Sequence, residues 1–268
     1  VTHIHYLGGV LPLLLKQPES PLDREHKVRM AWGGGCPLDV WRAFEERFGV
    51  VLREGYGLSE MTTFVTINPE GRLGSCGRAL PFYEVRLLGE DGQEAATGEL
   101  GEIIVRPLEA GLAFKGYFRM EEASAALMKD GWFSTGDLAR RDEDGFLFYA
   151  GRKKDSVRRR GVNISAWEVE RIVLTHDDIE ECALIGVPSD MGDDDLKLFV
   201  RPVSGRHTDP LDLIRWCETR LPYFQLPRYI EGIDEFPKTP TQRIKKSDLS
   251  RSVASCFDLD RSGYKISR

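Results

Sequence analysis

The stretch "VRMAWGGGCPLDVWRAFEERFGVVLREGYG" at residues 28–57 decides the fold class. It begins with an apolar run that ends in three glycines, which is typical of a buried strand followed by a turn. "PLDVWRAFEERFG" at 37–49 predicts a helix, because its apolar residues recur at helical spacing and Gly49 would end it. "VVLREGYG" at 50–57 then predicts the next strand and loop. We therefore expect alternating α and β structure over residues 1–72.

The pattern changes to short alternating apolar runs over residues 73–150. The dipeptides Asp91-Gly92 and Asp144-Gly145 are hairpin signals between such runs. This part predicts a β-rich, barrel-like subdomain with one helix near 121–129.

The charged stretch "GRKKDSVRRRG" at 151–161 is poor in apolar residues and bounded by glycines, which predicts a hinge and linker. A compact α+β pattern follows over 162–250. There, Ser165 and Glu168 have the spacing of a capping box that starts a helix. The polar end of the chain, 251–268, is expected to be a surface tail.

Composition limits the function classes. The chain has 268 residues, enough for one large or two modest domains, and a net charge of -6, which argues against a general binder of polyanions. The five cysteines form no C-x-x-C pair, so we expect reduced thiols in a cytoplasmic protein. The longest apolar run, at 11–15, is too short for a transmembrane segment.

Several polar motifs have an ordinary structural explanation when each is taken alone. "HIH" at 3–5 could supply two metal ligands, but no third ligand lies nearby in the sequence, which favours plain strand residues. Ser59 could be a helix N-cap with Glu60 in the first turn. "STGDL" at 134–138 could be a turn.

The arginines at 158–160 suggest a solvated linker face or a nucleic-acid patch. No aromatic residue is interleaved with them, and the chain is acidic overall. A small phosphorylated ligand fits better than a nucleic acid, because one or two cations then suffice.

Taken together, the motifs and their order resemble one known family. They are "GGCPL" at 34–38, "YGLSE" at 56–60, "GELGEIIVRP" at 98–107, "GY" at 116–117, "GWFSTGDL" at 131–138, "GRKKDSVRRRGVNISAWEVE" at 151–170 and "FPKTPTQRIKK" at 236–246. In this order the sequence resembles the adenylate-forming superfamily, which contains acyl-CoA synthetases, peptide-synthetase adenylation domains and beetle luciferases. "SAWEVE", "TPTQR" and the final "SGYKISR" are most similar to carnitine/crotonobetaine-type and fatty acyl-CoA ligases.

The resemblance implies a fold and a reaction. The fold would be the C-terminal part of a large α/β domain with a β-barrel-like subdomain, followed by a small mobile α+β domain. Such enzymes join a carboxylic acid to ATP, giving acyl-AMP and pyrophosphate, and then exchange AMP for the thiol of coenzyme A. The implied partners are therefore a small carboxylic acid, ATP, Mg²⁺ and coenzyme A, with no nucleic acid.

The same resemblance implies site roles, residue by residue. The backbone of Gly34, Gly35 and Cys36 would lie against adenine, and Tyr56, followed by Gly57, would stack on its face. Ser59 would bind phosphate, Glu60 would hold Mg²⁺, and Asp137 and Arg152 would bind the ribose. These residue types suit their roles, because an ionised carboxylate can accept hydrogen bonds from two ribose hydroxyls and Mg²⁺ prefers oxygen ligands.

The resemblance implies that the charged segment 151–161 takes part in a domain rotation. Lys154 matches the hinge about which the small domain rotates between the two half-reactions. After rotation, Arg158 and the loop ending at Gly161 would face the thiol substrate, and a glycine lets a pantetheine arm pass close to backbone. The basic loop also favours coenzyme A over a carrier protein.

Two features depart from the family pattern. The Ser/Thr/Gly-rich phosphate loop is absent, so we expect the C-terminal portion of a longer ligase that is inert by itself. The family's adenylation lysine is replaced by Arg243 in "PTQR", with Lys245 and Lys246 close by. An arginine presents a planar fork instead of a point charge. Three alternatives remain: Arg243 does the work of the missing lysine, a neighbouring lysine does it, or the first step is impaired.

A second function class is a non-catalytic nucleotide-binding module that keeps the AMP contacts. A nucleic-acid binder using the arginines at 158–160 is a third, and it would show steep salt dependence. The acid substrate and the oligomeric state cannot be read from the sequence.

Overall fold

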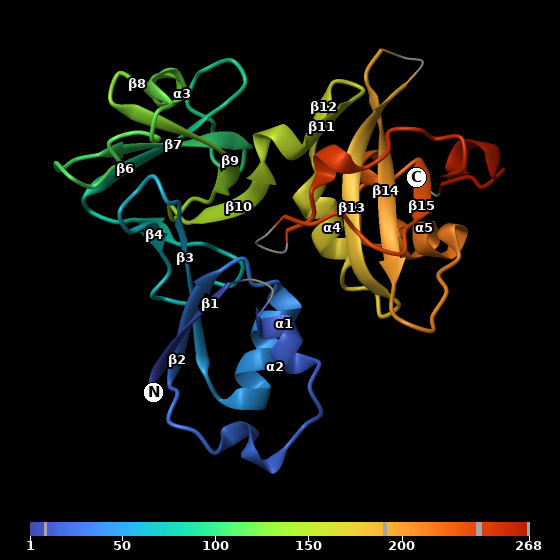
Figure 1. Cartoon of the computed structure of the whole chain (residues 1–268), viewed down its shortest axis with the longest axis horizontal. Coiled ribbons are helices and arrows are strands. Elements are labelled where there is room, and N and C mark those ends of the chain that lie inside the picture. Colours follow the sequence, from blue (N-terminus) through green and yellow to red (C-terminus); the bar gives the residue numbers. More distant parts are fainter. Residues whose placement is uncertain (8–9, 190–191, 240–242, 267–268) are drawn as a thin grey trace. The chain divides into compact units, whose positions relative to one another are not determined.

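The computed structural model describes residues 1–7, 10–189, 192–239 and 243–266. The chain forms two compact units, Val1–Ala150 and Gly151–Arg268, which are considered separately (Figure 1).

The first unit begins with a parallel α/β sheet. Its elements are β1 (His3–Leu7), α1 (Val10–Leu15), the 3-10 turn η1 (Pro21–Arg24), β2 (Met30–Gly34), α2 (Leu38–Phe48) and β3 (Val51–Gly57). Strands β1, β2 and β3 are neighbours and run parallel. Helix α2 ends at Gly49, whose φ of 67° is left-handed. The prediction of alternating α and β structure is confirmed.

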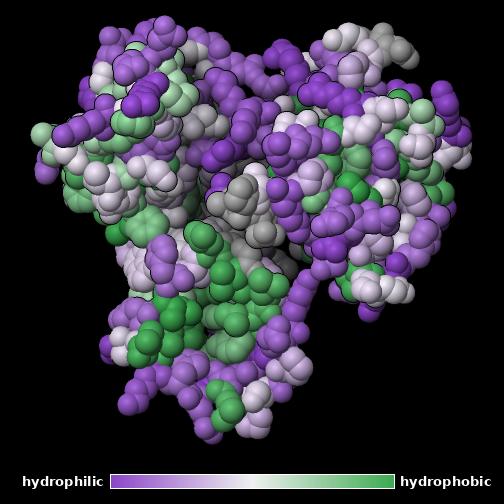
Figure 2. Space-filling model, in the orientation of Figure 1, coloured by the Kyte–Doolittle hydropathy of each residue, from purple (hydrophilic) through white to green (hydrophobic). Residues whose placement is uncertain are grey.

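A buried core holds α1 and α2 against this sheet. Trp41 and Phe44 of α2 are buried with Leu11 of α1, Tyr6 of β1 and Leu52 of β3. Four apolar side chains of β1 and α1 instead face solvent: Leu7, Val10, Leu13 and Leu14. Figure 2 shows apolar surface gathered over this part of the unit. Such a patch is typical of a protein contact surface.

Antiparallel strands complete the first unit. They are β4 (Phe64–Ile67), β5 (Arg78–Ala79), β6 (Tyr83–Leu88), β7 (Gly101–Pro107), β8 (Met128–Lys129), β9 (Trp132–Arg141) and β10 (Leu147–Arg152), with the helix α3 (Glu121–Leu127). β4 and β5 extend the first sheet, while the second has the order β10-β9-β7-β6 with β8 beside β9. A shared core that includes Tyr56, Val65, Ile103 and Phe133 joins the two sheets.

Both hairpin signals are confirmed as turns. The N–H of Gly92 donates to Gly89 C=O, and an isolated antiparallel β-bridge between Leu88 and Glu94 closes this turn. The N–H of Gly145 likewise donates to Asp142 C=O. The helix expected over 121–129 ends earlier, because its last two residues form β8.

The second unit is an α+β domain built on one mixed sheet. Its elements are η2 (Lys153–Asp155), β11 (Ser156–Arg159), β12 (Val162–Ser165), α4 (Ala166–Val173), β13 (Ile179–Pro188), β14 (Asp194–Pro202), α5 (Pro210–Glu218), η3 (Tyr223–Gln225), β15 (Tyr229–Gly232), η4 (Lys246–Asp248), β16 (Phe257–Asp258) and η5 (Leu259–Arg261). The sheet has the order β13-β14-β15-β16, and only β14 and β15 run parallel. The Ser165 side chain accepts from Glu168 N–H and caps α4, which is one of the two bonds of the expected capping box.

Two segments of this unit contain more regular structure than their sequence indicated. The segment 151–161, expected as a hinge and linker, contains η2 and β11, and β11 pairs with β12. The segment 251–268 is not only a surface tail, because β16 pairs with β15 and Leu259 is buried in the core. Its last two residues lie outside the described part of the chain.

A buried lysine fixes the start of that last segment. Lys197 of β14 has no exposed surface, and its ammonium donates to the carbonyl oxygens of Ser250 (2.9 Å) and Ser252 (2.5 Å). It also forms an ion pair with Glu231 at 2.6 Å. A buried cation requires such partners, so the sheet and the segment after it are ordered together.

The core under α2 leads to a stability prediction. Phe44→Ala removes a ring that is 2 % exposed, and we expect it to lower the unfolding free energy by about 3–5 kcal/mol. Phe118→Ala makes the same change at a ring that is 85 % exposed, and should cost less than about 0.5 kcal/mol. Urea unfolding followed by circular dichroism compares them, and equal losses would contradict this packing.

Candidate functional site

The carboxyl ends of β2 and β3 bring two glycine-rich segments together. Gly33 pairs with Glu54 in parallel register, so residues 34–36 lie next to 55–57. The approach is close, because a Cβ on Gly34 would meet the carbonyl oxygen of Gly55 at 3.0 Å. In open α/β sheets, ligands bind beyond the carboxyl ends of the strands. The structure thus places five expected nucleotide-binding residues at one edge of the sheet: Gly34, Gly35, Cys36, Tyr56 and Gly57.

A buried carboxylate shapes the loop after β2. Glu54 is 4 % exposed and accepts a hydrogen bond of 2.5 Å from the backbone N–H of Cys36. The Cys36 side chain is buried as well, whereas Gly35 is exposed and has a φ of 79°. The main chain that this loop offers to a ligand is therefore mainly that of Gly35.

An irregularity in β9 positions Asp137. Glu102 pairs with Leu138 but Ile104 pairs with Ser134, so β9 bulges over residues 135–137. The Thr135 hydroxyl donates to Ile103 C=O (2.7 Å) and accepts from Asp137 N–H (3.0 Å). The turn expected at "STGDL" is therefore a bulge within a strand. Bulges commonly re-aim a side chain beside a functional site.

The Asp137 carboxylate is held by two tyrosines. The Tyr56 hydroxyl donates to its Oδ2 at 2.7 Å, and the Tyr149 hydroxyl donates to Oδ1 at 3.4 Å. Burial, and next the negative charge of Asp137, raise the pKa of Tyr56, so its hydroxyl keeps the proton that it donates. The shorter bond fixes Oδ2 of the carboxylate, whereas the contact of Tyr149 with Oδ1 is longer. Tyr149 was not among the expected site residues.

The segment after β3 is a turn and not a helix. Met61 N–H donates to Leu58 C=O at 3.0 Å, and no helix begins at Ser59, so the alternative of an N-cap is wrong. Ser59 is exposed and Glu60 is half-buried. The Glu60 carboxylate accepts from the hydroxyl of Tyr117, whose pKa this bond raises. Tyr117 was not among the expected site residues, although it lies in the "GY" motif at 116–117, which could have pointed to it.

No protein-made metal cluster is visible in the described ranges. Over those residues, no three His, Cys, Asp or Glu side chains gather around a possible metal position. Within them, the "HIH" motif therefore has no further protein ligand, and the His5 ring lies 5.8 Å from that of Phe64. A single carboxylate such as Glu60 suits Mg²⁺, which usually keeps waters and binds substrate phosphates.

A basic groove in the second unit collects three further expected residues. It has a volume of about 630 Å³, and Arg152, Lys154 and Arg243 line it. Lys245 and Lys246 also line it, but each forms an ion pair, with Asp248 and with Glu170, both at 2.7 Å. Six cationic side chains line the groove against two acidic ones, which favours an anionic ligand: Arg152, Lys154, Arg243, Lys245, Lys246 and Arg251 against Asp155 and Asp194. The three residues before Arg243, "PTQ" at 240–242, lie outside the described residues.

The other two expected residues lie on the β11–β12 hairpin. Arg158 is exposed on β11, and Gly161 has a φ of 77° in the turn. The Gly161 N–H donates to the Asp193 carboxylate at 3.0 Å. The structure therefore places them apart from the groove lining.

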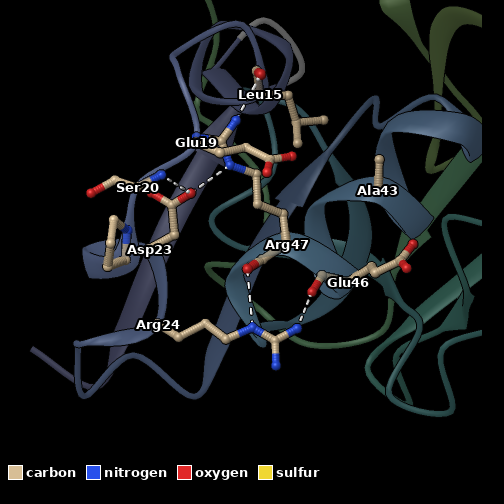
Figure 3. A pocket seen from close by; sticks show the side chains of 9 residues that line it. Leu15, Glu19, Ser20, Asp23, Arg24, Ala43, Glu46 and Arg47 are labelled. Atoms are coloured by element: carbon tan, nitrogen blue, oxygen red, sulfur yellow. Dashed lines mark hydrogen bonds and ion pairs between the residues drawn. The ribbon is translucent and has the colours of Figure 1, made fainter.

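A larger hollow of about 830 Å³ in the first unit does not have the character of a site. Figure 3 shows that its two arginine side chains bind the protein itself. Arg47 pairs with Asp23 and donates to the carbonyl oxygens of Leu15, Gln17 and Pro18, while Arg24 donates to the last turn of α2. These arginines tie down the segment between α1 and β2.

Two sequence-family models match the chain. The model described as AMP-binding enzyme covers residues 1–118, and that of the AMP-binding enzyme C-terminal domain covers 168–243, together more than half of the chain. A long-chain-fatty-acid–CoA ligase of Salmonella typhimurium is 36% identical over 83% of this chain and 40% of its own length. A crotonobetaine/carnitine–CoA ligase of Shigella flexneri is 32% identical over 88% of this chain and 47% of its own length.

Solved structures give the same result. The O-succinylbenzoate coenzyme A synthetase of Bacillus subtilis, in complex with AMP, has a TM-score of 0.81 and 27% identity over 93% of this chain and 50% of its own. ATP-bound MatB from Rhodopseudomonas palustris has a TM-score of 0.79 and 29% identity over 92% and 50%. The chain thus spans half or less of the length of these relatives.

The described part of the chain contains no helix that is long and apolar enough to cross a membrane. All five cysteines are free thiols.

The tyrosine pair leads to a prediction about stability. Tyr56→Phe removes the 2.7 Å bond to the buried Asp137 carboxylate, so we expect a loss of about 1.5–3 kcal/mol in unfolding free energy. Tyr149→Phe removes the longer 3.4 Å contact with this carboxylate and should cost less than Tyr56→Phe. Urea unfolding tests the order of the two variants, and the reverse order would contradict this arrangement.

Proposed function

Because this chain belongs to the family of AMP-binding enzymes, we propose that it is part of an AMP-forming acid–thiol ligase, an acyl-CoA synthetase. The longer protein would join a carboxylic acid to ATP, with release of pyrophosphate. The thiol of coenzyme A would then attack the acyl-AMP and release AMP. The single observation that best supports this is the Asp137 carboxylate held by Tyr56 next to the glycine-rich loop after β2.

The first unit would bind the nucleoside. The exposed main chain at Gly35 would lie along the base, and the Tyr56 ring would contact its face. Asp137 would accept hydrogen bonds from the ribose hydroxyls. The Tyr56 hydroxyl already orients the carboxylate, so ribose binding needs little rearrangement.

The turn after β3 would serve the phosphates. Ser59 is exposed and would donate to a phosphate oxygen, while Glu60 would supply one oxygen ligand to Mg²⁺. When bound, the ion would neutralise charge on the phosphates as the carboxylate attacks the α-phosphorus. Its remaining ligands would be waters and phosphate oxygens.

The second unit would supply the cations for both half-reactions. Arg243 would stabilise negative charge in acyl-AMP formation, in place of the family's lysine, and Arg152 would contact the ribose. Rotation about Lys154 would then bring Arg158 and Gly161 to the thiol substrate. Exposure of these four charged side chains suits groups that meet their ligand only transiently.

Binding of AMP to this chain tests the nucleoside site. We expect Asp137→Asn to weaken binding by roughly ten- to a hundredfold, because a charge-assisted bond to ribose is lost. Calorimetry should also show that the unaltered chain prefers AMP to 2′-deoxy-AMP and that the variant does not. Asp212→Asn, at an exposed residue of α5, is the matched control. Equal binding by both variants would exclude the proposed role.

The role of Arg243 is tested in the full-length protein. Arg243→Ala should slow acyl-AMP formation at least about tenfold but spare thioester formation from supplied acyl-AMP, because the charge matters only in the first step. Arg243→Lys should restore much of the rate. Arg251→Ala changes another cation of the same groove and is the control. Equal loss in both steps would eliminate this assignment.

A further inference from the structure

Tyr117 and Glu60 meet although they lie 57 residues apart in the sequence. The Tyr117 hydroxyl donates to Oε1 of Glu60. One oxygen of this carboxylate is thereby engaged by the protein, and the rotation of the side chain is restricted.

The backbone of the same loop also holds the Glu60 turn. The N–H of Phe114 donates to Glu60 C=O at 2.7 Å, and Met61 pairs with Ala113 in an isolated bridge. The N–H of Thr62 donates to Leu112 C=O at 3.2 Å. Both the main chain and the carboxylate of Glu60 are therefore positioned by residues 112–117.

The loop is itself anchored to the start of α3. The Ser124 hydroxyl accepts from Tyr117 N–H and donates to Met120 C=O, both at 2.8 Å. Gly116 has a φ of 130°, and a Cβ there would lie 3.1 Å from the Ser124 hydroxyl oxygen. The Tyr117 ring packs edge-on against Phe114 at 4.9 Å. These contacts set the place from which the hydroxyl reaches Glu60.

We propose that Tyr117 is a positioning residue for Glu60, which fixes one carboxylate oxygen and presents the other to a divalent cation bound to the nucleotide phosphates. The inference rests on the proposed function, because it assumes that Glu60 meets the cation. Without this bond, Glu60 would have to lose its rotational freedom when the cation binds, and ordering a long side chain weakens binding. Partners that orient a metal ligand typically change metal affinity by about 10- to 100-fold.

If the Tyr117 hydroxyl had only a structural role, its removal would lower stability and leave the cation dependence unchanged. Tyr117 is 37% exposed and Glu60 is half-buried, and a hydrogen bond in such a position adds little to folding stability. Tyr117→Phe keeps the ring contact with Phe114 and removes only the hydroxyl. Its effect should therefore appear in cation dependence and not in stability.

The test compares ATP binding and acyl-AMP formation by the full-length protein over a range of Mg²⁺ concentrations. In Tyr117→Phe, we expect the Mg²⁺ concentration for half-maximal acyl-AMP formation to rise about tenfold, with a smaller change in rate at saturating Mg²⁺. Calorimetry supplies a readout besides activity. The gain in ATP affinity on replacing EDTA with Mg²⁺ should shrink by a similar factor.

A matched control exists in the second unit. Tyr264 donates to Glu218 in the same kind of Tyr–Glu pair, so Tyr264→Phe should leave both Mg²⁺ readouts and thermal stability unchanged within error. Glu60→Gln is the positive control. If Glu60→Gln alters Mg²⁺ dependence and Tyr117→Phe does not, the positioning role is wrong. If Glu60→Gln also leaves it unchanged, the proposed role of Glu60 in the ligase fails.

Discussion

The hydrogen bond from Tyr56 to Asp137 is the interaction on which the first unit depends. It joins β3 of the parallel sheet to β9 of the antiparallel sheet, 81 residues apart, at 2.7 Å. Both side chains are at least nine-tenths buried, and this donor helps to offset the hydration that the carboxylate loses. The bulge in β9 aims Asp137 at Tyr56. One polar contact therefore links the two sheets beside their shared core and also orients the proposed ribose acceptor.

The same principle governs the neighbouring polar groups. Buried Glu54 is satisfied by the Cys36 N–H, and half-buried Glu60 is satisfied by Tyr117. In each case a side chain or backbone group from a different segment supplies the donor. Acceptors that are held before a ligand arrives need little reorganisation on binding. The acidic groups at this edge are thus ordered by the fold itself.

The sequence alone predicted the local elements well and the long-range contacts poorly. Helix α2 and its end at Gly49 were readable, because spacing and a left-handed glycine are local signals. The burial of Lys197 in β14 was not readable, because its partners Glu231, Ser250 and Ser252 lie far from it in the sequence. Family resemblance pointed to Asp137 as a candidate site residue. Its bond to Tyr56 depends on how the β9 bulge pairs with β7, which no local pattern encodes.

The candidate site of the first unit is acidic and the groove of the second unit is basic, so the two suit different parts of the proposed reaction. In the first unit, the candidate site offers carboxylates, Asp137 and Glu60, which suit hydroxyl donors and a cation. In the second, the groove with Arg152, Lys154 and Arg243 offers cations, which suit phosphate oxygens. The carboxylates can bind ribose and Mg²⁺ but have the wrong sign of charge to stabilise the reacting phosphate directly, whereas the groove adds cations that can, besides Arg152 for the ribose. Acyl-AMP formation as proposed therefore requires both units, while recognition of AMP requires mainly the first.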